Sequence, residues 1–200
     1  MLDVHLRPQL QYLFDFCAYQ CIKLGLTPNR LTLIAFCVGI LTTPCLIYGY
    51  NGIALICLLF SGLCDVLDGT VARLTHTSHP FGAYIDLISD RMVEAIFILG
   101  FAVLYPDLSI VYILFLISVL LHFSTFLAAG ALFKNASEKS MHYDRSIIER
   151  AEVFVLFVCM IIIPQYQKPL LLTVTIIIFM AGLNRIRRVW LMTNDLKTEQ

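Results

Sequence analysis

Six apolar runs constrain the fold of this chain more than any other feature of the sequence. They cover residues 31–50, 53–74, 81–104, 108–133, 148–163 and 170–190. A membrane-spanning helix needs about 20 predominantly apolar residues, and each run is near that length. Only 14% of the residues are charged, whereas soluble domains usually have about 25%. The sequence therefore predicts an all-α integral membrane protein with six transmembrane helices.

The first 26 residues have a different pattern. Apolar residues recur there every three or four positions, and polar side chains such as Arg7, Gln11 and Asp15 fill the other sides. This spacing is typical of an amphipathic helix in the membrane interface; a helix packed against the protein itself is the alternative. We expect an amphipathic juxtamembrane helix over residues 1–26 and a six-helix membrane domain over residues 27–200.

The basic residues predict how the chain is oriented. If the N-terminus is cytoplasmic, most basic residues lie on or near the cytoplasmic side, and only Lys168 lies in an opposite loop. Cytoplasmic loops carry an excess of Lys and Arg. We therefore expect both termini on the cytoplasmic side of a multi-pass protein, in the cytoplasmic membrane if the source is bacterial.

Four carboxylates interrupt the second and third apolar runs. They are Asp65, Asp68, Asp86 and Asp90. At the centre of a membrane helix each would cost about 2.5–3.5 kcal/mol. Two nearby cations, Arg73 and Arg91, are too few to neutralise them as ion pairs. The sequence therefore indicates a bound divalent cation.

The spacing of these carboxylates supports a shared site. Asp65 and Asp68 are three residues apart and Asp86 and Asp90 are four apart, so each pair lies on one helical face. A short return between the two runs makes their helices antiparallel neighbours. Carboxylate oxygens suit Mg²⁺ or Mn²⁺, which usually work with substrate phosphates. The site is predicted near the cytoplasmic ends of the two helices.

The same stretch resembles a known family. Residues 65–90 fit the pattern D-x2-D-G-x2-A-R-x8-G-x3-D-x3-D at all eight of its fixed positions. This pattern is similar to the signature of the CDP-alcohol phosphotransferases. The segment P-N-R-L-T at residues 28–32 resembles a second element of that family. The resemblance extends over about residues 27–91.

The resemblance implies a fold and an activity. Similar proteins are homodimers with six membrane helices and a site open to the cytoplasm. They move a substituted phosphate from a CDP-alcohol, here most simply CDP-diacylglycerol, to a hydroxyl acceptor and release CMP. We expect the lipid bilayer as a partner and no nucleic acid.

The resemblance also assigns roles to residues. The metal site would be formed by Asp65, Asp68 and Asp86, with Asp90 as its fourth residue. Asp90 would also act as the general base. Contacts to the CDP-alcohol would come from Asn29, Thr32, Asp65, Gly69, Ala72, Arg73 and Gly82. The glycine at 69 leaves space for close approach, and the Arg73 guanidinium has a shape that fits a phosphate.

The sequence does not identify the acceptor alcohol, and it leaves two alternative functions open. A phosphorylated acceptor needs cations beside the metal, and Lys139, Arg145 and Arg150 are the candidates. An amino-alcohol phosphotransferase would instead use a small CDP-alcohol donor and diacylglycerol as acceptor. A divalent-cation transporter could use the same carboxylates. His76 and His79 have no assigned role, whereas His122, isolated in an apolar run, is expected to bond a neighbouring helix.

Overall fold

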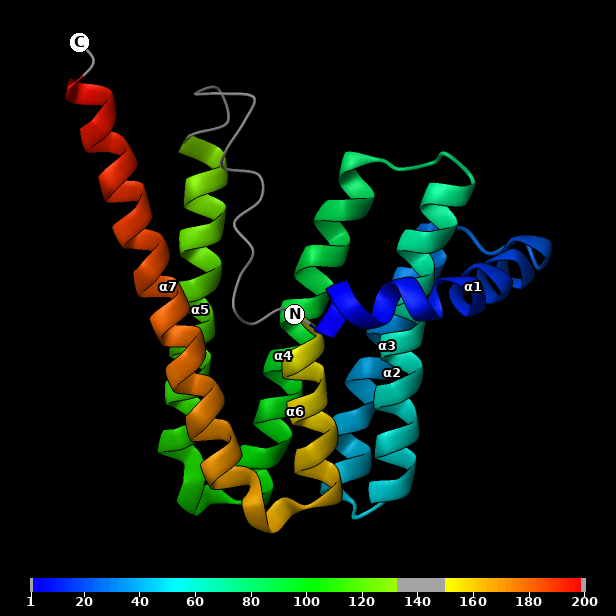
Figure 1. Ribbon diagram of the computed structural model, residues 1–200. Coiled ribbons are helices and arrows are strands. Elements are labelled where there is room, and N and C mark those ends of the chain that lie inside the picture. Colours follow the sequence, from blue (N-terminus) through cyan, green and yellow to red (C-terminus); the bar gives the residue numbers. More distant parts are fainter. Residues whose placement is uncertain (1, 133–149, 199–200) are drawn as a thin grey trace.

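The structure, a computed structural model, describes residues 2–132 and 150–198, and every regular element in these ranges is a helix (Figure 1). In chain order the elements are α1 (Leu2–Lys23), α2 (Pro28–Ile47), α3 (Asn51–Leu74), α4 (Pro80–Leu104), η1 (Pro106–Leu108), α5 (Ser109–Leu132), α6 (Arg150–Ile162), η3 (Pro164–Tyr166) and α7 (Gln167–Thr198). The prediction of an all-α protein is confirmed.

Proline and glycine fix the helix boundaries. Pro28 and Pro80 open α2 and α4, where a missing backbone N–H is harmless and the fixed φ suits a helix. The dipeptide Asn51-Gly52 predicts a tight turn between the first two apolar runs, but the structure has no turn at that position. The turn lies earlier, where Gly49 takes a left-handed φ of 80° that favours glycine. Asn51 and Gly52 instead form the first turn of α3.

Helices α2 to α7 run side by side in alternating directions, and α1 lies across the side of the molecule that holds α2 and α3 (Figure 1). The α2–α3 connection, η1 and η3 gather at one end of the molecule, and the α3–α4 connection lies at the other. Helix α2 packs mainly on α3 and α4, and α5 packs mainly on α7. The C-terminal half of α3 and the N-terminal half of α4 carry the four Asp residues, and both helices have α2 as their main neighbour.

An aromatic core joins the later helices to α4. The rings of Phe97 in α4 and Phe157 in α6 stack with centroids 4.2 Å apart, and Phe115 of α5 meets Phe157 edge-on. All three side chains are buried. Between α5 and α7, Tyr112 Oη donates a 2.6 Å hydrogen bond to Gln167 Oε1. These contacts set the position of α4 against α5, α6 and α7.

Helix α1 is anchored beside the carboxylates. Its Ala18 is fully buried in a cluster with Leu31 of α2 and Leu67 and Val71 of α3. Elsewhere on α1 large apolar side chains are exposed: Leu10, Tyr12, Leu13, Phe16 and Tyr19. The helix therefore packs on the protein through one side and leaves apolar groups uncovered elsewhere.

Four of the described helical segments are long and apolar enough to cross a membrane. They are Pro28–Ile47, Asn51–Leu74, Pro106–Leu132 and Pro164–Asn194. The chain is an integral membrane protein. The other two predicted spans are different in kind: α4 carries charged residues along its first half, and α6 has only 13 residues.

Candidate active site

Three carboxylates from two helices converge at the end of the α3–α4 hairpin. Asp65 and Asp68 come from one face of α3, and Asp86 comes from the second turn of α4. One ligand oxygen from each lies within 4.8 Å of the other two. Three hard oxygen donors this close fit the coordination preference of Mg²⁺ or Mn²⁺. Among the described residues, they form a group able to hold a divalent cation.

A threonine from a third helix positions Asp68. Thr32 Oγ1 in α2 donates a hydrogen bond of 2.5 Å to Asp68 Oδ2, and both residues are buried. The same hydroxyl lies 3.1 Å from the Pro28 carbonyl oxygen. A hydroxyl has one proton, and a bond to an ionised acceptor is the stronger choice. Thr32 was expected to contact the CDP-alcohol; the structure adds this direct contact with a predicted metal ligand.

Arg73 lies along α3 next to Gly69. Its Nη2 donates to Thr70 Oγ1 at 2.9 Å, and a Cβ added at Gly69 would meet only Arg73 Nη1, at 3.5 Å. The guanidinium is therefore beside an open patch of helix surface. Arg73 is exposed, and Ala72 is half-buried on the same helix. Gly69 and Arg73, two residues assigned to the CDP-alcohol, are adjacent in space.

The first turns of α2 and α4 also meet. A Cβ at Gly82 would lie 3.1 Å from Asn29 Oδ1, a closer approach than most Cβ atoms tolerate. The glycine thus lets Asn29 come against the start of α4. Next to it, His79 Nδ1 accepts a hydrogen bond from the Phe81 backbone N–H. His79, which had no assigned role, caps α4.

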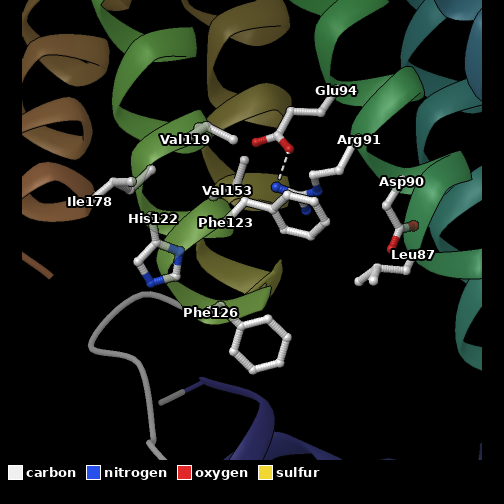
Figure 2. A pocket seen from close by; sticks show the side chains of 10 residues that line it. All are labelled: Leu87, Asp90, Arg91, Glu94, Val119, His122, Phe123, Phe126, Val153 and Ile178. Carbon is white, nitrogen blue, oxygen red and sulfur yellow. Dashed lines mark ion pairs between the residues drawn. The ribbon is translucent and has the colours of Figure 1, made fainter. Parts of the chain in front are cut away.

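Asp90 is outside the three-carboxylate group and faces a separate cavity. The cavity has a volume of about 160 Å³ and is lined by residues from four helices. Among them are Asp90, Arg91 and Glu94 of α4, His122 of α5, Val153 of α6 and Ile178 of α7 (Figure 2). The predicted base therefore stands one helical turn from Asp86, at the wall of a space large enough for a small molecule.

The charged side chains in the wall of this cavity all come from α4. Arg91 Nη1 lies 2.5 Å from Glu94 Oε2, and the Arg91 guanidinium sits over the Phe123 ring. Glu94 is only 5% exposed. Glu94 follows Asp90 by four residues, so the sequence alone predicts that both lie on one helical face. The burial of Glu94 beside a cavity is evident only from the structure.

Arg185 was missed by the sequence analysis. The sequence indicates a cytoplasmic basic residue there, with lipid-headgroup or acceptor contacts as its role, yet Arg185 is buried. Its Nη1 donates a 2.9 Å hydrogen bond to the His122 carbonyl oxygen, and its Nη2 lies 3.4 Å from His122 Nε2. The isolated His122 was the available signal, since it was expected to bond a neighbouring helix. That expectation is confirmed, with α7 as the neighbour.

The structure gives little information on the residues predicted to bind the acceptor. Lys139, Arg145 and the side chain of Arg150 lie outside the described residues. Arg150 begins α6, one turn before Val153, which lines the cavity. Its backbone therefore enters α6 close to the cavity, and its role stays a prediction.

Comparisons with known proteins agree on one family. Residues 25–192 match the model of the family described as CDP-alcohol phosphatidyltransferase. The chain is 31% identical over 176 residues to inner membrane protein YnjF of Escherichia coli, covering 83% of this chain and 84% of that protein. It is 31% identical over 97 residues to archaetidylinositol phosphate synthase of Pyrococcus horikoshii, which is 48% of this chain and 52% of that one.

Two solved structures share the fold. Phosphatidylinositol phosphate synthase (PgsA1) of Mycobacterium tuberculosis, crystallised with CDP-DAG bound, superposes with a TM-score of 0.72 at 18% identity. The match covers 90% of this chain and 94% of that one. The same enzyme in complex with manganese and citrate gives a TM-score of 0.71 at 19% identity, with 88% of each chain covered.

Proposed function

Because this chain belongs to the CDP-alcohol phosphatidyltransferase family, we propose that it transfers a phosphatidyl group from CDP-diacylglycerol to a hydroxyl acceptor and releases CMP. Membership confirms the predicted family and the enzyme class. The three grouped carboxylates support the expected dependence on a divalent metal. The observation that carries the proposal is the meeting of three carboxylates next to a cavity that holds a fourth, Asp90.

The donor and its metal would bind at the α3–α4 hairpin. Asp65, Asp68 and Asp86 would hold Mg²⁺ or Mn²⁺, and their separation of at most 4.8 Å supports this. A bound divalent cation neutralises charge on the diphosphate and polarises the phosphorus that is attacked. The neighbouring structures with CDP-DAG and with manganese support the same donor and metal class. Contacts to the CDP part would come from Asn29, Thr32, Asp65, Gly69, Ala72, Arg73 and Gly82.

Asp90 would act as the general base. It takes the proton from the acceptor hydroxyl as that oxygen attacks the β-phosphorus. A new P–O bond forms to the acceptor, the bond from the β-phosphorus to the bridging oxygen breaks, and CMP leaves with the bonding electrons. The proton on Asp90 then passes to water. Asp90 suits this role because it lines the cavity and is not among the three grouped carboxylates.

Release of CMP by purified protein tests this function. With CDP-diacylglycerol, Mg²⁺ or Mn²⁺ and a panel of glycerol 3-phosphate, an inositol phosphate and serine, we expect CMP release that depends on one of these acceptors. EDTA should abolish the release, and added metal should restore it.

Two outcomes would favour the alternatives. CMP release only from a small CDP-alcohol with diacylglycerol as acceptor would identify an amino-alcohol phosphotransferase. Metal uptake into vesicles without CMP release would identify a transporter. The position of Asp68, less than two turns from the end of α3, argues against a transport site at mid-membrane.

The membrane topology is also a proposal. We infer six spans, formed by α2 to α7, with cytoplasmic termini and site, and with α1 in the interface. The alternating directions of these helices (Figure 1) and the exposed apolar side chains of α1 support this arrangement. We also propose that the protein forms the homodimer that the family resemblance implies.

Cysteine labelling tests the orientation. In a variant without the seven native cysteines, Asn51→Cys and Ser78→Cys place single thiols at opposite ends of α3, at exposed positions. A membrane-impermeant reagent added outside intact cells should label position 51 and spare position 78. Permeabilised cells should be labelled at both positions. Labelling of position 78 alone in intact cells would reverse the orientation.

A further inference from the structure

Thr70 of α3 is a buried residue whose hydroxyl makes two hydrogen bonds. Its side chain is only 2% exposed. Thr70 Oγ1 donates to the Val66 carbonyl oxygen at 2.9 Å and accepts from Arg73 Nη2 at 2.9 Å. One proton and the oxygen lone pairs are enough for both bonds. Position 70 is one of the unspecified positions in the pattern of residues 65–90, so the family resemblance assigns it no role.

The bond to Thr70 restricts the guanidinium of Arg73. Arg73 is exposed in the last turn of α3, and a long side chain of this kind has many accessible rotamers when nothing holds it. A guanidinium is planar and rigid, so a bond to one terminal nitrogen limits where the other can lie. That other nitrogen, Nη1, is the atom that a Cβ at Gly69 would meet, at 3.5 Å. The bond therefore favours a guanidinium held beside the open surface at Gly69.

A second threonine shows which of the two bonds is special. Thr75 Oγ1 donates to the Val71 carbonyl oxygen at 2.7 Å, and its other partner is the Thr77 hydroxyl. A bond from a threonine hydroxyl to the carbonyl four residues earlier is common in helices, so Thr70 and Thr75 share that bond. The bond from Arg73 to Thr70 is the difference between the two. Because Thr70 is buried and Arg73 is exposed, a ligand would touch the arginine and not the threonine.

We propose that Thr70 is a positioning residue for the donor substrate. It holds the Arg73 guanidinium beside Gly69 before CDP-diacylglycerol binds, so the phosphates of the donor meet an arginine that is already ordered. Without the hydroxyl, donor binding must order the side chain itself, which weakens binding. This inference rests on the proposed function, in which Gly69 and Arg73 contact the donor. It adds a residue that acts on donor affinity through Arg73 and leaves acceptor binding unchanged.

Thr70→Val tests the role of the hydroxyl. Valine has the shape of threonine, and the Val66 carbonyl keeps the backbone bond that the helix provides, so the melting temperature should stay the same. The Kd for CDP-diacylglycerol should rise roughly threefold to tenfold, the usual effect of having to order one long side chain. The KM for the acceptor should not change. Thr70→Ser, which keeps the hydroxyl, should bind the donor as the unmodified protein does.

Thr75→Val is the matched control. It removes a hydroxyl that makes the same bond to the carbonyl four residues earlier, but it leaves the bond between Arg73 and Thr70 intact. Its Kd for CDP-diacylglycerol should equal that of the unmodified protein. If Thr75→Val and Thr70→Val weaken donor binding equally, the effect comes from the helix backbone and the proposal is wrong.

A double substitution assigns the effect to Arg73. In an Arg73→Ala background the partner of Thr70 is missing, so adding Thr70→Val should not raise the donor Kd further. An equal rise in both backgrounds would mean that Thr70 acts through packing. If Arg73→Ala binds too little donor to measure, the comparison of Thr70→Val with Thr70→Ser decides the role of the hydroxyl. If Thr70→Val does not fold, Thr70→Ala, which also lacks the hydroxyl, replaces it.

The outcomes separate this proposal from the proposed function. Failure of the unmodified protein to bind CDP-diacylglycerol and to release CMP would refute the proposed function itself. Normal binding and CMP release, with the same donor Kd in Thr70→Val as in the unmodified protein, would refute the role of Thr70 alone.

Discussion

Asp90→Asn should lower CMP release by about 10²–10⁴-fold, the usual contribution of a general base. The substitution keeps the shape and one oxygen but cannot accept a proton. Asp90 is not one of the three carboxylates that lie within 4.8 Å of one another, so affinity for the metal and for CDP-diacylglycerol should stay close to that of the unmodified protein. CMP release titrated with Mg²⁺ or Mn²⁺, with donor binding measured alongside, checks both points.

Asp68→Asn is the matched comparison, because it makes the same chemical change one helix away. Asp68 is a member of the carboxylate group and accepts the hydrogen bond from Thr32. Its loss should weaken metal binding, so part of the activity should return at high metal concentration. If excess metal restores Asp90→Asn as fully as Asp68→Asn, Asp90 is another ligand and the base lies elsewhere.

Gly39→Ala should destabilise the fold, although the same change in a helix is normally favourable by about 1 kcal/mol. A Cβ there would lie 2.8 Å from both γ-carbons of Val93 and 2.9 Å from Ser61 Oγ. Ser61 in turn donates a 2.7 Å hydrogen bond to the Ala35 carbonyl oxygen. Overpacking of this kind costs about 1–3 kcal/mol. We expect a lower melting temperature in detergent and reduced CMP release, since Val93 precedes Glu94.

Gly52→Ala is the control for this prediction. Gly52 is exposed in the first turn of α3, and a Cβ there would meet nothing within 4 Å. The variant should melt at the same temperature as the unmodified protein or above it. Equal melting temperatures for the Gly39 and Gly52 variants would mean that α2 does not approach α4 as closely as described.

Much of the fold was predictable because its signals are local. Hydropathy placed the helices, and Pro28 and Pro80 marked the starts of α2 and α4. The carboxylate group was predictable because each pair has helical spacing and a short connection keeps the two helices near enough for the carboxylates to meet. The expectation that the two helices pack directly on each other was wrong, since α2 is the main neighbour of both. The turn at Gly49 was missed, since Asn51-Gly52 is the stronger turn dipeptide in the sequence alone.

Contacts between helices were harder to predict. The bond between Thr32 and Asp68 depends on how α2 is rotated against α3, and the contact of Arg185 with His122 joins residues 63 positions apart. Hydropathy does not encode helix rotation or crossing angle; packing of individual side chains sets both. For the same reason the cavity beside Asp90, which needs four helices at once, had no counterpart in the sequence pattern.

The cavity lies where two differently built halves of the molecule meet. Helix α2 packs on both α3 and α4, which carry the carboxylates, whereas α5 packs mainly on α7 and supplies the opposite wall. If the acceptor binds in this cavity, as proposed, substitutions at Val119, Val153 or Ile178 should change its binding and leave the carboxylate group unchanged. Such a chain can change its product through substitutions in one half alone. The type of reaction and the choice of acceptor alcohol can therefore evolve separately.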